Sequence, residues 1–164
     1  MGAGKTTMGR QLGKKLHLDF IDSDREIEQR TGVDIPLIFE KEGEEGFRDR
    51  EQHVIDELTQ QNNIVLATGG GAVIREDNRR HLKSRGIVLY LHTDIKNLIA
   101  RTRHDNKRPL LQTADPAKKL RELMEIREPL YRETADIIIN TGEKSIHSVI
   151  QVILGRLKSY QNNQ

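Results

Sequence analysis

The chain contains no cysteine among its 164 residues and has no long apolar run. Without cysteine it can form neither a disulfide framework nor a thiolate metal site. The longest apolar runs, such as residues 87–91, are far too short to span a bilayer, so we expect no membrane partner. No secretory segment precedes the first motif, and we therefore expect a cytoplasmic location.

The chain also has little net charge and no histidine cluster. Its formal net charge is +2, from 27 basic and 25 acidic side chains. This excess is too small to predict nucleic-acid binding by bulk attraction, although Lys107, Arg108 and residues 101–103 concentrate positive charge locally. The six histidines show no metal-ligand spacing. We therefore expect an anionic small molecule as the partner, and no nucleic acid.

What the chain does have is a phosphate-binding pattern at its start. Residues 2–6 supply the last five letters of the motif G-x-x-x-x-G-K-[ST]. Small residues suit this loop because consecutive backbone N–H groups must all face phosphate oxygens. A helix predicted from residue 5 to about residue 15 would turn its N-terminal dipole toward the phosphates, with Lys5 reaching the β- and γ-phosphates and Thr6 binding Mg²⁺. The alternative is an ordinary turn, in which G-x-G-K also occurs by chance.

Behind this loop, short apolar runs alternate with helical patterns, which is typical of an α/β domain with a parallel sheet. The length of the chain suits one such domain. We expect strands at residues 20–21, 64–67, 87–91 and 136–140. Long helical patterns bound residues 105–115, which have no apolar periodicity and are the best candidate for a mobile loop.

Three predicted helices follow one another between the first two strands. Ser23 and Glu26 fit a capping box for the first helix, which Gly32 ends. The second covers residues 35–42 and ends at Gly43, and the third has apolar residues on one face. A run of helices without a strand predicts an insertion beside the sheet, at about residues 23–60.

Acidic residues and glycines stand at the ends of two predicted strands, where parallel α/β sheets place their ligands. Asp22 and Asp24 follow the first strand. With phosphates nearby, one carboxylate could hold Mg²⁺ through water while the other accepts a proton from an attacking hydroxyl. The alternative is a pair of helix-capping acids. Residues 69–71 are three glycines, which we interpret as backbone that approaches a ligand closely rather than as a simple turn.

Three arginines are candidates for binding anions. Arg48 stands three residues before Glu51 on one helix face, so the two can pair, although such pairs are more often solvated surface pairs. Arg108 lies in the candidate loop, where a cation can close over phosphates during phosphoryl transfer. Arg127 lies near the end of the helix that starts at Pro116, where an arginine ordinarily complements the helix dipole.

In order and spacing, these motifs resemble the shikimate kinases. The resemblance covers nearly the whole chain, and it implies a three-layer P-loop kinase fold with a five-stranded parallel sheet, a helical substrate-binding insertion and a lid at about residues 103–115. Members of this family transfer the γ-phosphate of ATP to the 3-hydroxyl of shikimate in aromatic amino-acid synthesis. The motifs that carry the resemblance are Gly2-Ala3-Gly4-Lys5-Thr6-Thr7, Asp22-Ser23-Asp24, Gly46-Phe47-Arg48, Thr68-Gly69-Gly70-Gly71, Arg108-Pro109-Leu110-Leu111, and Arg127 with Pro129-Leu130-Tyr131.

The resemblance also implies roles for individual residues. The nucleotide would contact Gly2, Ala3, Gly4, Lys5, Thr6, Thr7, Arg101 and Arg108, with Arg101 stacking on adenine and Arg108 reaching the phosphates from the lid. Mg²⁺ would be bound by Thr6 and, through water, by Asp22. The catalytic residues would be Asp24, Lys5 and Arg108. Shikimate would be bound by Asp24, Arg48, Glu51, Gly69, Gly70, Gly71 and Arg127, with the two arginines on its carboxylate. We further expect a monomer.

The front of the chain departs from the family pattern. In the family, a hydrophobic strand and the first glycine of the loop precede the residues with which this chain begins, and that strand lies in the middle of the sheet. We therefore expect a gap between the strands at residues 64–67 and 87–91. We also expect a natural start roughly ten to fifteen residues upstream, with Met1 internal. The chain as given should then be poorly soluble or molten and should bind ATP weakly.

Other functions stay open from the sequence. A kinase for another polyol acid, such as gluconate, would share the loop and the lid but would not require Arg48 and Arg127 together with the three glycines. A nucleoside monophosphate kinase would need a base-recognition surface that the sequence does not display. A non-catalytic ligand-binding relative is the alternative from another class, although intact Lys5 and Asp24 argue against it.

Overall fold

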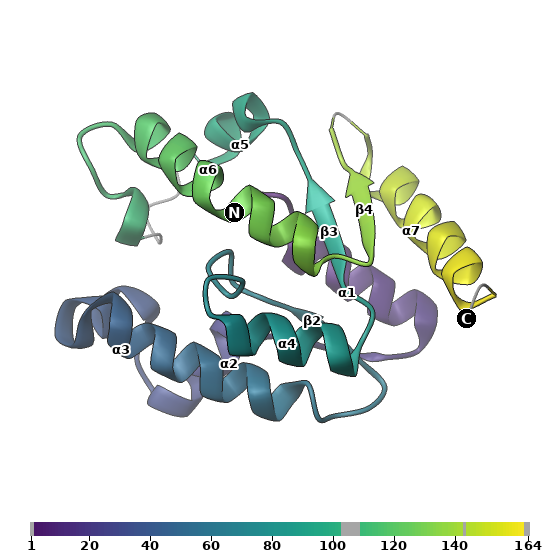
Figure 1. Ribbon diagram of the computed structural model, residues 1–164, viewed down its shortest axis with the longest axis horizontal. Coiled ribbons are helices and arrows are strands. Elements are labelled where there is room, and N and C mark those ends of the chain that lie inside the picture. Colours follow the sequence, from purple (N-terminus) through teal and green to yellow (C-terminus); the bar gives the residue numbers. More distant parts are fainter. Residues whose placement is uncertain (1, 103–108, 143, 163–164) are drawn as a thin grey trace.

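A computed structural model shows four short strands with helices packed around them (Figure 1). The structure describes residues 2–102, 109–142 and 144–162. In these residues, chain order gives α1 (Lys5–Leu16), β1 (Asp19–Asp22), α2 (Ser23–Thr31), α3 (Ile35–Leu58), β2 (Ile64–Ala67), α4 (Glu76–Arg85), β3 (Leu89–His92), α5 (Ile95–Thr102), a 3₁₀ turn (Pro109–Leu111), α6 (Pro116–Thr134), β4 (Ile137–Asn140) and α7 (Ile146–Gln161).

The strands form two separate parallel pairs. β1 pairs with β2, with Asp19 opposite Ile64, and β3 pairs with β4, with Leu89 opposite Ile137. Within the described residues, no ladder joins the two pairs. The parallel α/β class expected from the sequence is confirmed, and so is the gap between β2 and β3.

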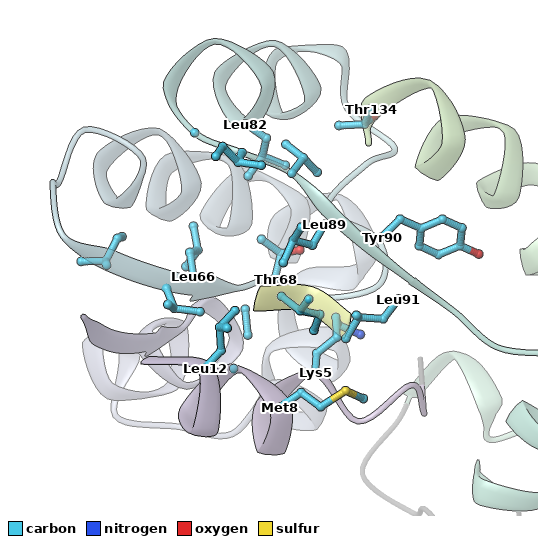
Figure 2. Close-up of a pocket in the computed structure, with 18 of the residues that line it drawn as sticks. Lys5, Met8, Leu12, Leu66, Thr68, Leu82, Leu89, Tyr90, Leu91 and Thr134 are labelled. Carbon is cyan, nitrogen blue, oxygen red and sulfur yellow. The ribbon is translucent and has the colours of Figure 1, made fainter. Parts of the chain in front are cut away.

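A cavity of about 750 Å³ occupies this gap. Figure 2 shows Leu12 of α1, Leu66 of β2, and Leu89 and Leu91 of β3 around the same space. Lys5 of α1 also lines the cavity. The start of α1 therefore borders an apolar space on its sheet side.

Helices pack against both strand pairs (Figure 1), and α1 contacts both of them. Met8 and Leu12 of α1 pack with Ile139 of β4 and Ile150 of α7 in one buried core cluster. A second cluster joins α2 and α3, through the side chains of Ile27, Ile38, Phe47, Val54 and Leu58. Ile21 of β1 and Leu66 of β2 pack against this cluster, so α2 and α3 are joined to the first strand pair by apolar contacts.

The long helix α3 is broken at Gly43, which confirms that two helices meet there. Gly43 has φ 72° and ψ −175°, a conformation that side chains with a Cβ rarely adopt. Across the break, Arg50 donates to both carboxylate oxygens of Glu42, at 2.7 and 2.8 Å. This ion pair therefore joins the two halves of α3 across the break.

Three local predictions were wrong. The cap of α2 is Asp22, whose carboxylate accepts from the N–H of Asp24, while Ser23 lies inside the helix and its hydroxyl accepts from the N–H of Gly69 at 3.3 Å. β3 begins at Leu89 rather than at residue 87. α6 continues through Pro129 to Thr134, because its buried residues pack on both sides of the proline.

The expected mobile loop at residues 105–115 is only partly described, because residues 105–108 lie outside the described part of the chain. Residues Pro109–Leu111 form the 3₁₀ turn, and Leu111 is buried in one cluster with Leu98 and Leu120. The second half of the segment is therefore packed against the protein through Leu111. The lack of apolar periodicity in the sequence did not indicate this contact.

Candidate active site

The residues of the phosphate-loop pattern form a turn that leads into α1. Gly2 and Gly4 have φ values of 66° and 79°, the left-handed region that favours glycine. Gly4 is the N-cap of α1, where no side chain caps the helix. The first turn of α1, which includes half-buried Thr7, therefore presents a helix N-terminus of the kind that binds anions.

The structure brings together the two residues expected to hold a metal. The hydroxyl of Thr6 donates to Oδ2 of Asp22 at 2.8 Å, while Oδ1 of Asp22 accepts from the N–H of Asp24 at 3.1 Å. In the described part of the chain, no group of three or more histidine, cysteine or acidic side chains could hold a metal ion. A cation here would therefore take a hydroxyl, a carboxylate and phosphate or water oxygens, which suits Mg²⁺.

Arg48 and Glu51 form a buried ion pair on α3, so the predicted pairing is confirmed while the surface alternative is wrong. Nη1 of Arg48 donates to Oε2 of Glu51 at 2.6 Å, and their side chains are 5% and 0% exposed. Burial raises the pKa of Glu51 above its usual range, although Arg48 opposes this. A Cβ on Gly71 would lie 2.3 Å from the Arg48 guanidinium, so this glycine is needed for the close approach.

Asp24 and Glu51 meet at Gly69, the first glycine of the same run. A Cβ on Gly69 would lie 2.7 Å from Oδ1 of Asp24 and 2.8 Å from Oε1 of Glu51. These contacts place carboxylates from α2 and α3 against the backbone that follows β2. The close approach that we expected of the three glycines is therefore made by the protein's own charged side chains.

Arg127 joins this group from α6, buried with a side chain that is 2% exposed. Among the described residues, its Nε and Nη2 have no hydrogen-bond partner. Burial lowers the pKa of Arg127, and the positive charge of Arg48 acts in the same direction. The guanidinium groups of Arg48 and Arg127 are therefore close enough to repel each other, and a bound anion would offset this repulsion.

We name the four charged residues Asp24, Arg48, Glu51 and Arg127 the acid-binding cluster. Its supports include Tyr131, whose hydroxyl donates to the carbonyl oxygen of Gly70. The Tyr131 ring stacks on Tyr90 with centroids 5.0 Å apart, and the Tyr90 hydroxyl hydrogen-bonds Glu128. Sequence reasoning missed this contact, because Tyr131 and Gly70 are 61 residues apart and no local pattern pairs them.

Glu44 is a second partner of Arg48 that the sequence analysis did not single out. Its Oε1 accepts from Nη2 of Arg48 at 3.0 Å and from Nε at 3.3 Å. The two residues are four apart on a helix, a spacing that could have indicated the pair.

The remaining predicted nucleotide residues are placed only in part. Arg101 is exposed and donates to the carbonyl oxygens of Gly2 at 3.4 Å and Gly142 at 3.2 Å, so it ties the phosphate loop to the turn after β4. Ala3 is buried and lines the central cavity. Arg108 lies outside the described residues, and so do residues 103–107 of the expected lid.

Comparison with known proteins gives consistent matches. The family model for shikimate kinase matches residues 1–158. A shikimate kinase of Nitrosococcus oceani is 56% identical over 161 residues, covering 98% of this chain and 85% of that protein. One of Pseudomonas syringae pv. tomato is 57% identical over 157 residues, covering 96% and 91%.

Solved structures agree with these matches. A shikimate kinase from Acinetobacter baumannii in complex with shikimate has a TM-score of 0.95 and 52% identity, covering 98% of this chain and 89% of that one. A gluconokinase from Sinorhizobium meliloti has a TM-score of 0.60 at 14% identity, covering 99% and 90%, a likeness that shows the fold alone.

Proposed function

This chain belongs to the shikimate kinase family, and from that premise we propose that it transfers the γ-phosphate of ATP to the 3-hydroxyl of shikimate. One observation of its own structure carries the proposal further. Arg127 is buried beside the Arg48–Glu51 pair, and its Nε and Nη2 have no hydrogen-bond partner among the described residues. Tyr131 is a side-chain hydrogen-bond partner of Arg127, but burying the N–H groups of Nε and Nη2 without partners is costly, so the arrangement favours an acidic ligand at this point.

Arg127 and Arg48 would bind the carboxylate of shikimate. A guanidinium meets a carboxylate with two parallel hydrogen bonds, which fixes orientation as well as charge. Glu51 holds Arg48 in place, and residues Gly69, Gly70 and Gly71 form the backbone against which the acid would lie. Tyr131 fixes Gly70 through its carbonyl oxygen.

Asp24 would accept the proton of the 3-hydroxyl as the hydroxyl oxygen attacks the γ-phosphorus. The bond from phosphorus to the β,γ-bridging oxygen then breaks, and ADP leaves with the electron pair. Lys5, with Arg108 from the lid, would stabilise the negative charge on the transferred group. Support for the assignment of Asp24 comes from its contact position at Gly69, beside the acid-binding arginines.

Thr6 and Asp22 would hold Mg²⁺, which neutralises phosphate charge when bound. The geometry fits, because the hydroxyl of Thr6 and the carboxylate of Asp22 lie 2.8 Å apart at the end of β1 and the start of α1. Gly2, Ala3, Gly4 and Thr7 would surround the phosphates.

The proposal assigns the substrate-binding insertion to residues 23–60 and the lid to residues 103–115. We also propose that the protein is a monomer and that it lies in the cytoplasm, where ATP is available. In the described part of the chain, no helix is long and apolar enough to cross a membrane.

A coupled assay of ADP release tests the proposed function. We expect turnover with ATP and shikimate, and little with gluconate or a nucleoside monophosphate at the same concentration. Asp24→Asn serves as the inactive control for each acceptor. Turnover with gluconate that matches or exceeds turnover with shikimate would overturn the proposal in favour of another sugar-acid kinase. Tight binding of both ligands without ADP release would favour a non-catalytic relative.

A further inference from the structure

Each of the three guanidinium nitrogens of Arg48 donates to a carboxylate of the protein itself. Glu51 accepts from Nη1 at 2.6 Å, and Glu44 accepts from Nη2 at 3.0 Å and from Nε at 3.3 Å. A ligand carboxylate binds a guanidinium best along an edge that offers two parallel N–H groups. On Arg48 the Nε–Nη2 edge is such an edge, and Glu44 occupies it.

The two carboxylates differ in how easily they could leave. The side chain of Glu51 is 0% exposed, whereas that of Glu44 is 43% exposed. Glu44 directly follows the break at Gly43, so its side chain starts at the beginning of a helical segment and faces solvent on one side. It can turn into water at little cost, because an ion pair within a helix is weak when its carboxylate is exposed to solvent.

Arg48 does not need Glu44 to stay in position. Its guanidinium lies over the ring of Phe47 at 5.2 Å from the centroid and packs against Gly71, while Glu51 fixes its other side. The negative charge of Glu44 also acts on Arg127. Glu44 therefore neutralises both acid-binding arginines from the rim of the site.

We propose that Glu44 is an internal counter-ion that occupies the carboxylate position on Arg48 and is displaced when the acid substrate binds. The inference rests on the proposed function, since it names the group that regulates affinity at the same site. Displacement keeps the charge of the cluster unchanged, because one carboxylate replaces another. Glu44 thus lowers affinity for the acid and holds the two arginines neutralised in its absence.

Removing the charge of Glu44 tests this directly. In Glu44→Gln, we expect the Kd and the KM for shikimate to fall about two- to fivefold, because the substrate carboxylate no longer competes with Glu44 for Arg48 and an ion pair of this kind is weak. The kcat and the KM for ATP should change less than about twofold. The methyl ester of shikimate, which lacks the carboxylate charge, should bind the variant and the unchanged chain equally. If Glu44 had a purely structural role, its substitution would change the binding of shikimate and of the methyl ester by the same factor.

Glu45→Gln is the matched control, because it removes the same charge one residue away. Glu45 is 88% exposed and pairs with Arg75 instead of Arg48. Its Kd for shikimate should stay within about twofold of the unchanged chain. Shikimate binding to Glu44→Gln that is unchanged or weaker, while the unchanged chain binds normally, would overturn this inference alone. An unchanged chain that binds no shikimate would overturn the proposed function and this inference with it.

Discussion

Two regions that share β2 differ in how their space is filled. At its carboxyl end, Asp24, Arg48 and Glu51 lie so close to the following glycines that a Cβ on Gly69 or Gly71 would collide with them. Along its unpaired edge, the same strand faces a cavity of about 750 Å³, and no ladder among the described residues satisfies its backbone there. The acid-binding cluster is therefore packed, whereas the central cavity is not.

The difference in packing indicates which of the two binding sites, for the acid or for the nucleotide, depends on the cavity. None of the four charged side chains of the cluster lines the cavity, although the neighbouring Gly69, Gly70 and Tyr131 do. In the phosphate loop, Ala3 and the charged Lys5 themselves line it. We therefore expect the acid site to be formed in the chain as it is, and the nucleotide site to depend on how the cavity is filled. The predictions below test this contrast.

The largest effect should come from filling the cavity with a strand. An apolar segment of about five or six residues, joined ahead of residue 1, could pair with β2 and β3 and bury its side chains between them. Each large apolar side chain buried would contribute about 1.5–3 kcal/mol. We expect the melting temperature to rise by about 2–4 °C for each kcal/mol gained, and ATP binding to strengthen more than shikimate binding.

The control for this extension is a segment of equal length made of serine and asparagine. Differential scanning calorimetry and titration calorimetry would compare both with the unextended chain. Equal melting temperatures for the apolar and polar extensions would show that the cavity does not accept a strand. If the apolar extension strengthened shikimate binding more than ATP binding, the acid site rather than the nucleotide site would depend on the cavity.

The next largest effect should come from Asp24. We expect Asp24→Asn to lower kcat by about 10²–10⁴-fold, because the amide cannot accept the proton of the attacking hydroxyl. ATP binding should remain, since the phosphate loop is not changed. Asp19→Asn, on the exposed start of β1, is the control and should keep its rate. Full turnover by Asp24→Asn would remove Asp24 from the chemistry.

Arg127→Lys should have a smaller effect, and only on the acid. An ammonium replaces two directed hydrogen bonds by a point charge, and hydrogen bonds to charged groups are each worth about 1.5–3 kcal/mol. We expect shikimate to bind about 10- to 100-fold more weakly, with ATP nearly unaffected. Arg132→Lys, on the same helix and paired with Glu128 at 2.8 Å, should change neither. Equal losses for both ligands would mean that Arg127 does not bind the acid.

The smallest effect concerns pH and the buried carboxyl of Glu51. Burial raises its pKa in the folded chain above the ordinary 4.5. A raised pKa means that the folded state holds the proton more tightly, so the stability this group contributes is fully present below 4.5 and is lost as pH rises through the folded pKa. As pH rises from 4.5 through the folded pKa, the unchanged chain should lose stability that Glu51→Gln does not lose. The free energy of unfolding of Glu51→Gln, measured in urea, should therefore increase relative to that of the unchanged chain. A constant difference would show that Glu51 titrates normally.

Local patterns in the sequence predicted most of the fold. β2 was predicted at its observed bounds, because its four apolar residues are followed directly by glycines. The break at Gly43 was predicted because glycine alone tolerates that backbone conformation. The predicted capping box at Ser23 was wrong because the Ser23 hydroxyl makes a tertiary contact. It accepts from the N–H of Gly69, and Asp22 caps the helix instead.

The site residues were predicted as separate motifs, and their contacts were not. Arg48 and Glu51 could be paired from their spacing, but nothing local indicated that the pair is buried, since burial depends on Gly71 and α6. The hydrogen bond from Tyr131 to Gly70 joins segments that are far apart in the chain, so no pattern along the sequence could reveal it. Helix spacing alone could have indicated Glu44.

The stacked pair Tyr90 and Tyr131 gives the protein an optical reporter at its binding site. The chain contains three tyrosines and no tryptophan, so tyrosine emission is not lost by energy transfer to an indole ring. Two of the three emitters lie in this stack, one touching the backbone of Gly70 and the other a carboxylate. Ligand binding beside Gly70 should therefore change the intrinsic fluorescence of the unlabelled protein, and stopped-flow detection could follow the acid as it arrives.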